Sequence, residues 1–282
     1  MDRNEYRQES RKTWNDLASM WEARGEDINR PVAPVAEWLV QRLDAQPGET
    51  ILDIAAGAGP VSHAISPQVG DGGRVICADF APSMVEAARR RGEALGVSNV
   101  DYREMDAEQM DLGDDSVDGA VCRFGYMLMA DPVKAMSETR RVLRPGGRLV
   151  LAVWAEPARN PWVLVPASVL IEQGHMQMPD PDGPGIFALG DQAKLEAALQ
   201  AAGLEPAEAV DIDVRHRFEE REGLWREAST MMGPIAKAIG ELSEADRDAV
   251  RETINERVEQ FRDGDGYALA GAVHAVLARP AG

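Results

Sequence analysis

Short apolar runs alternate with helical patterns through the middle of the chain. Five runs have the length of buried strands, and turns or amphipathic stretches separate them. Strands that alternate with helices form parallel βαβ units, so this pattern predicts an open α/β sheet. The expected strands cover residues 50–54, 74–79, 100–104, 117–123 and 148–154.

Other segments lie outside this alternation and predict how the chain is divided. Residues 1–46 look helical and are expected to form an N-terminal cap. The core is expected over 47–218, with a Pro- and Met-rich lid loop at 155–190. A helical insertion is expected over 219–266, and 267–282 should provide the final strand of the core sheet.

Composition and charge exclude several classes of protein. The 282 residues are 44% hydrophobic and 28% charged, which is typical of a globular domain. The net charge of −18 opposes the approach of phosphate backbones, so we expect no nucleic-acid partner. The N-terminus has no apolar signal region, and no apolar run approaches the roughly 20 residues of a membrane span. We therefore expect a cytoplasmic protein.

The cysteines and histidines predict no metal site. Cys77 and Cys122 stand inside apolar runs, as small buried hydrophobic residues do. The four histidines are scattered, with no Cys or His at metal-ligand spacing. The candidate chemistry lies elsewhere.

The most informative stretch is 51–60, where a strand ends in a turn of tiny residues that opens a helix. Such a turn lets a ligand approach backbone N–H groups and the positive end of a helix dipole. A nicotinamide-binding fingerprint requires a third glycine or similarly small residue three positions after Gly59. Ser62 stands there, so the fingerprint is matched only in part. A P-loop needs Lys-Ser/Thr after the glycines, and Pro-Val follows here instead.

Acidic residues are expected at the same edge of the sheet. Asp79 ends the second strand, twenty residues after Gly59, where an acid can accept hydrogen bonds from both ribose hydroxyls. The alternative is an acid that merely stands at a helix entry. Asp53 and Asp106 end or follow neighbouring strands, so all three acids fall at the carboxyl ends, where such sheets bind ligands.

Together these motifs resemble the class I S-adenosylmethionine-dependent methyltransferases, and among them the branch of the ubiquinone/menaquinone C-methyltransferases. The resemblance covers about residues 48–155. It implies a Rossmann-like, doubly wound, seven-stranded α/β sheet whose last strand is antiparallel, with a helical N-terminal cap and lid insertions. The matching stretches are LDIAAGAG at 52–59, ADFAPSMVEAA at 78–88, EMDAEQM at 104–110, VDGAVCRFG at 117–125 and RVLRPGGRLVLAVW at 141–154.

The resemblance also implies S-adenosylmethionine as cofactor and a set of residues around it. Acidic side chains would hold its polar groups, with Asp79 on the ribose and Asp106 on the adenine amino group. Phe80 or Met84 would pack on the adenine, and Arg123 would lie by the methionine portion. The full expected set is Asp53, Ala56, Gly57, Ala58, Gly59, Asp79, Phe80, Met84, Asp106, Ala107 and Arg123.

One position departs from the family pattern. Ala55 stands where the family usually has glycine. A methyl group is tolerated there if the φ angle is negative, so a close approach of the cofactor to the backbone is less expected at this one residue.

The acceptor side carries weaker signals, because methyl transfer depends mainly on alignment and on exclusion of water. A hydroxyl acceptor would need a base, and His63, Tyr126 and His175 are the candidates. Each also has a purely structural interpretation. His63 could cap or line the first helix of the core, Tyr126 could form a pocket wall, and His175 could lie in a solvated loop. Residues 123–126 read Arg-Phe-Gly-Tyr and lack the Asn/Asp-Pro-Pro-Tyr/Phe motif of methyltransferases that act on adenine or glutamine nitrogen. Carbon or oxygen of a small metabolite is the expected acceptor.

Two tryptophans extend the acceptor hypothesis to the cap. Trp14 and Trp21 are seven residues apart and share a helix face. They either pack the cap onto the core, or they cover the cofactor pocket or stack on a flat substrate. Tyr126 is grouped with them as an expected substrate or lid residue.

Two other functions stay open at this point. An NAD(P)-dependent oxidoreductase could use the same kind of fold, but the chain has no Tyr-x-x-x-Lys pair. A non-catalytic cofactor-binding protein is the other alternative, and a homo-oligomer is not decided by the sequence.

Overall fold

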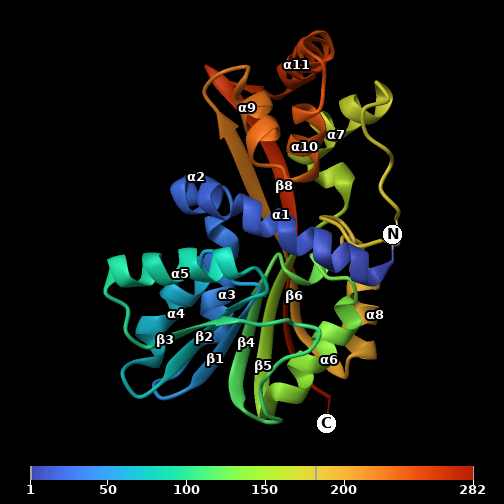
Figure 1. Ribbon diagram of the computed structural model, residues 1–282. Helices are drawn as coiled ribbons and strands as arrows, with labels where there is room; N and C mark the ends of the chain where they lie inside the picture. The colour runs from blue at the N-terminus through green and yellow to red at the C-terminus, as the bar shows by residue number, and fades with distance from the viewer. Residues whose placement is uncertain (1, 182, 282) are drawn as a thin grey trace.

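The computed structural model describes residues 2–181 and 183–281, and its centre is one mixed β-sheet (Figure 1). The strands lie in the order β3-β2-β1-β4-β5-β8-β6, and a short β7 pairs with β8. Their bounds are β1 Thr50–Ile54, β2 Arg74–Asp79, β3 Val100–Glu104, β4 Val117–Arg123, β5 Leu143–Trp154, β6 Leu204–Phe218, β7 Arg262–Asp263 and β8 Gly266–Pro280.

The strand directions confirm the fold expected from the sequence. β1 pairs in parallel with β2 and with β4, and β4 pairs in parallel with β5. β8, the last strand of the chain, is antiparallel to both β5 and β6. The strand order changes direction between β1 and β4. In open α/β sheets, ligands bind at the carboxyl ends beside such a switch point.

Helices cover both faces of the sheet. One layer contains α3 (Ala33–Leu43), α4 (Pro60–Val69) and α5 (Pro82–Leu95), and the other contains α6 (Pro132–Val142) and α8 (Gln192–Ala201) (Figure 1). The inward side of α3 is completely buried at Val35, Leu39 and Leu43. This helix therefore belongs to the packed core, although it falls within the stretch expected to form the cap.

Two helices lie across the carboxyl edge of the sheet. The long α1 (Arg3–Ala23) packs against α5, and the short α2 (Gly25–Asn29) follows it (Figure 1). The side chain of Asp2 caps α1 by accepting hydrogen bonds from the Asn4 and Glu5 N–H groups. Of residues 1–46, these two helices are the part that lies over the candidate site.

A second helical cluster stands beyond the same edge, around an extension of β6 and β8. The pairing of β5 with β8 ends at Trp154–Val273, whereas β6 and β8 remain paired as far as Phe218–Tyr267. This ribbon projects past the sheet and carries helices against it (Figure 1). They are α7 (Pro161–Glu172), α9 (Gly223–Thr230), α10 (Pro234–Gly240) and α11 (Glu244–Val258).

Buried Asn160 fixes the start of this cluster to the sheet. Its amide nitrogen donates to the Ala155 carbonyl at 3.0 Å and to the Ala272 carbonyl at 3.2 Å. Its amide oxygen accepts from the Ala272 N–H at 3.1 Å and from the indole N–H of Trp162 at 3.2 Å. One side chain thus connects α7 with β8 and orients Trp162.

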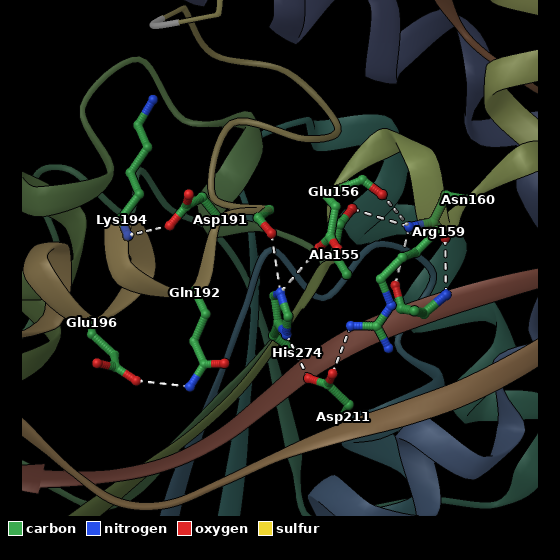
Figure 2. A network of polar contacts seen from close by, with 12 residues as sticks. Ala155, Glu156, Arg159, Asn160, Asp191, Gln192, Lys194, Glu196, Asp211 and His274 are labelled. Carbon is green, nitrogen blue, oxygen red and sulfur yellow. Dashed lines mark hydrogen bonds and ion pairs between the residues drawn. The ribbon is translucent and has the colours of Figure 1, made fainter.

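His274 on β8 makes a second connection, to the end of the expected lid loop (Figure 2). Its Nε2 lies 3.0 Å from the Gly190 carbonyl oxygen, and its Nδ1 lies 2.7 Å from Oδ1 of Asp211. Arg159 also donates to Asp211, at 2.6 Å. Burial acts against ionisation of Asp211, but hydrogen bonds from Arg159 and His274 outweigh it and lower the pKa of Asp211. This network holds both ends of the loop against the strands.

Gly271 provides a test of this junction. A Cβ there would lie 2.6 Å from Cγ2 of Val214 and 3.2 Å from Oδ1 of Asn160. We predict that Gly271→Ala lowers the free energy of unfolding by about 1–3 kcal/mol, because well-packed cores resist an added methyl group. Urea unfolding measures the loss. Gly113→Ala is the control, because no atom lies within 4 Å of its added Cβ, and an equal effect of both substitutions would contradict the prediction.

Candidate cofactor and acceptor site

The glycine-rich turn between β1 and α4 has the conformation that its small residues suggest. Gly57 and Gly59 have φ angles of +56° and +75°, in the left-handed region that favours glycine. A Cβ on Gly57 would meet no atom within 4 Å, so the described structure leaves this backbone open to a ligand. The neighbouring Ala56 donates its N–H to the Ala78 carbonyl at 3.0 Å, which holds the turn against β2.

The condition of a negative φ at Ala55 is not met. Its φ is +53°, so this residue has the left-handed conformation for which the family usually supplies glycine. A Cβ on Gly125 would lie only 2.7 Å from the Ala55 methyl. The glycine that follows β4 thus provides the space that Ala55 needs, a compensation between two residues far apart in the sequence.

Asp79, at the end of β2, fixes the glycine-rich turn by a hydrogen bond. Its Oδ2 accepts from the Gly57 N–H at 2.9 Å, and its Oδ1 accepts from the Ala81 N–H at 2.9 Å. Burial raises the pKa of this carboxyl, while hydrogen bonds from backbone N–H groups act in the opposite direction. Each carboxylate oxygen can accept more than one hydrogen bond, so the ribose role expected of Asp79 fits this geometry and stays a prediction.

Asp53 is the most buried acid of the site, with 1% of its surface exposed. Its Oδ2 accepts from the Ser62 hydroxyl at 2.6 Å. Burial raises the pKa of Asp53 to about 6, although Ser62 and Arg123 favour its charged form. In the sequence, Ser62 stands out only as a partial match to the nicotinamide fingerprint, whereas in the structure its hydrogen bond to Asp53 joins α4 to β1.

Arg123 ends β4 on the other side of β1. Its guanidinium donates to Oδ1 of Asn29 at 2.6 Å and so connects α2 with the sheet edge. Burial lowers the pKa of Arg123 to about 10, with Asp53 opposing the shift. The side chain remains a cation near neutral pH and can pair with a carboxylate. Asn29, a partner of this cation, carries no signal in the sequence.

A hollow of about 580 Å³ lies between α1 and the ends of β2 and β3. Phe80 and Asp106, both expected near the adenine, face it together with polar residues of α1. Arg7 of α1 forms ion pairs with Asp106 and Glu108. The cap thus forms the outer wall of this hollow. Its lining residues are Asn4, Arg7, Gln8, Arg11, Phe80, Glu104, Met105 and Asp106.

The other residues expected at the cofactor lie at its margins. Met84 is 1% exposed and packs in the small cluster between α1 and α5. Ala107 is half-buried and packs against the main core. Ala58 lines a smaller hollow of about 220 Å³ beside α5. These three residues lie around the glycine-rich turn and do not line the 580 Å³ hollow.

Trp14 and Trp21 pack the cap onto the core. Their rings meet edge to face with centroids 5.7 Å apart, and both pack against the buried cluster that contains Ala18, Ala81 and Met84. Of the two hypotheses for this pair, the contacts support packing between α1 and α5.

The structure separates the three candidate bases from one another. His63 lies between α4 and α5 with its Nε2 3.0 Å from the Tyr102 hydroxyl, and burial lowers its pKa to about 4. Tyr126 is completely buried, its hydroxyl is 2.7 Å from Oγ1 of Thr139, and burial raises its pKa well above the usual value. It is a core residue, so it forms neither a pocket wall nor a lid. His175 is half-buried just after α7.

Sequence reasoning missed a column of rings above the ends of β4 and β5. Phe124 stacks on Trp154 with centroids 4.7 Å apart and planes 6° apart. Trp154 lies 4.9 Å from Trp162, and Trp162 stacks on His216 at 4.1 Å and 14°. One sequence signal could have indicated this column. Phe124 directly follows β4 and Trp154 ends the neighbouring β5, so two aromatic residues stand at adjacent strand ends. The partners from α7 and β6 meet them only in the fold.

The described residues contain neither a membrane-spanning helix nor a metal-binding cluster. None of their helices is long and apolar enough to cross a membrane. No group of His, Cys, Asp and Glu among them has the arrangement that holds a metal ion. Cys77 and Cys122 are buried free thiols.

Comparison with known proteins places this site in a family. A family model described as a methyltransferase domain matches residues 52–151. The ubiquinone/menaquinone biosynthesis C-methyltransferase UbiE of Enterobacter sp. (strain 638) is 34% identical over 171 residues, covering 57% of this chain and 68% of that protein. The demethylmenaquinone methyltransferase of Clavibacter sepedonicus is 34% identical over 188 residues, covering 64% and 70%. A crystal structure from Bacillus halodurans C-125 covers 88% of this chain and 99% of its own, at 24% identity and a TM-score of 0.60.

The chain therefore belongs to the S-adenosylmethionine-dependent methyltransferases, in the family that contains these two enzymes. Its cofactor is S-adenosylmethionine, which supplies an activated methyl group on a sulfonium sulfur. The residues present fit this cofactor, because an open backbone at Gly57, the carboxylate of Asp79 and a hollow beside Phe80 lie along one edge. The match disfavours the nicotinamide alternative.

Asp79 allows a direct test of the cofactor site. We predict that Asp79→Ala weakens binding of S-adenosylhomocysteine roughly tenfold or more, because each charge-assisted hydrogen bond lost is worth about 1.5–3 kcal/mol. Titration calorimetry measures the affinity, and circular dichroism checks that the variant is folded. Asp101→Ala on β3 is the control. An unchanged affinity in folded Asp79→Ala would show that the ribose assignment is wrong.

Ala55 yields an opposite prediction, a gain in stability. Ala55→Gly should raise the free energy of unfolding by about 0.5–1 kcal/mol. The substitution removes the steric strain of an alanine in the left-handed conformation, and this gain exceeds the extra conformational entropy that a glycine loses on folding. Ala56→Gly, the control next to it, should instead lower stability by about 0.4–1 kcal/mol, since the φ of Ala56 is not positive. Thermal unfolding of both variants gives the comparison, and a loss in both would contradict the assigned strain.

Proposed function

We propose that this enzyme transfers the methyl group of S-adenosylmethionine to a carbon or oxygen atom of a small-molecule metabolite. The observation that carries the proposal is the position of the aromatic column. It begins at Phe124, directly after Arg123 at the end of β4, and therefore next to the open turn at Gly57. Cofactor and acceptor would meet at the carboxyl ends of β1, β4 and β5.

The chain's own residues would perform three tasks in this reaction. Asp79 and the turn at Gly57 would bind the cofactor, and Arg123 would pair with its carboxylate. The apolar rings of Phe124 and Trp154 would receive the acceptor and exclude water from the transfer. Alignment of the nucleophile with the methyl–sulfur bond supplies most of the catalysis in such a site.

The relatives favour carbon as the atom methylated. By name, the Enterobacter protein is a C-methyltransferase and the Clavibacter protein acts on demethylmenaquinone. A quinone-type acceptor is therefore part of the proposal. The acidic charge of −18 supports a small molecule over a nucleic acid. The two free buried thiols support a reducing, cytoplasmic location.

A thermal-shift comparison tests the cofactor class. We predict that S-adenosylhomocysteine at a hundred times its Kd raises the Tm by roughly 5–10 °C, because such binding adds about 2.7 kcal/mol to the stability of the folded protein. NADH at the same concentration should leave the Tm unchanged. Stabilisation by NADH alone would reject the proposal.

An activity assay then tests the acceptor. Reduced demethylmenaquinone and methyl-labelled S-adenosylmethionine should yield label in the organic phase with the wild-type chain, and much less label with Asp79→Ala. The site of the label, on carbon or on oxygen, follows from mass spectrometry of the product.

A further inference from the structure

His216 is a buried polar residue that the cofactor site does not use. It lies on the part of β6 that projects past β5, with 5% of its surface exposed. Among the residues that the structure describes, neither of its ring nitrogens has a hydrogen-bond partner. A buried imidazole without such a partner is unfavourable, so this position requires an explanation.

A carboxylate stands behind this imidazole. Oε1 of Glu227, on α9, lies 3.6 Å from Nδ1 of His216, slightly beyond hydrogen-bond distance. Distances of this kind are common in enzymes without substrate, and they shorten when the substrate binds. A carboxylate at Nδ1 selects the tautomer in which Nδ1 carries the proton and Nε2 accepts one.

The surroundings of His216 place it on the acceptor side. Its ring stacks on Trp162 and lies 6.1 Å from the centroid of Trp154, the last residue of β5. Trp154 in turn stacks on Phe124, beside the end of β4. His216 is thus the polar member at the far end of an aromatic wall that starts beside the expected cofactor.

We propose that His216, oriented by Glu227, binds the hydroxyl group of a flat aromatic acceptor, a phenol or hydroquinone. This inference rests on the proposed methyl transfer and adds the residue that recognises the acceptor. Stacked rings favour a planar molecule, and a single hydrogen-bond acceptor at Nε2 suits a hydroxyl donor.

The same contact can move a proton during the reaction. Nε2 of His216 takes the hydroxyl proton, and the electron pair left on oxygen is delocalised into the ring. The ortho carbon then forms a bond to the methyl carbon as the methyl–sulfur bond breaks, and sulfur keeps the electron pair of that bond. The ring carbon finally loses its own proton to water while His216 returns its proton to the oxygen.

Binding of two matched probes to the full-length protein tests this proposal. The probes are 1-naphthol and 1-methoxynaphthalene, which share a ring system but differ in the hydroxyl proton. Calorimetry is run with and without S-adenosylhomocysteine. We expect wild-type protein to bind 1-naphthol roughly tenfold more tightly than the ether, the value of about one hydrogen bond.

Variants then assign that preference to the dyad. His216→Asn should bind both probes equally, and Glu227→Gln should reduce the preference without abolishing it. Neither variant should change the affinity for S-adenosylhomocysteine. His175→Asn is the control, because this half-buried histidine lies outside the aromatic column, and it should keep the full preference.

Each contrary result has a separate meaning. If folded His216→Asn still prefers 1-naphthol over the ether, the proposed role of His216 is wrong. If His216→Asn does not fold, Glu227→Gln replaces it, and a full preference in Glu227→Gln would overturn the proposal. S-adenosylhomocysteine binding with no binding of either ring overturns the phenolic acceptor and leaves methyl transfer standing. Absence of S-adenosylhomocysteine binding would reject the proposed function itself.

Discussion

The hydrogen bond from the Gly57 N–H to the Asp79 carboxylate is the contact on which this site depends. It joins the turn after β1 to the end of β2, two segments that the parallel register already places side by side. The same carboxylate accepts from the Ala81 N–H, at the start of α5. A single half-buried acid therefore orients the turn, the helix entry and its own oxygens, and it offers the cofactor a preformed surface.

The proposed acceptor side depends on a different feature, the continuation of β6 and β8 beyond the sheet. This ribbon carries His216 and receives α7 through Asn160, which is bound to both the N–H and the carbonyl of Ala272. Gly271 leaves the space for that approach. The candidate cofactor site and the proposed acceptor site thus have separate structural supports.

Much of the cofactor side was predictable, because its residues stand at fixed places in local patterns. A strand, a turn of small residues and an acid twenty positions later define one edge of a parallel sheet, and the comparisons confirm the family. The sequence left the φ of Ala55 open, because the space for its left-handed conformation comes from Gly125, across the sheet edge. The hypothesis that Tyr126 lines the pocket was wrong because η1 (Tyr126–Leu128) turns it toward Thr139 in the core.

The sequence by itself determined the alternating β and α elements, the family and the positions of the acids, since these follow from periodicity and short-range spacing. Only the tertiary structure decided which rings meet. Phe124, Trp154, Trp162 and His216 come from four separate elements, and no spacing between them predicts a stack. Contacts between distant segments depend on strand register and helix packing, which the local pattern of residues does not contain.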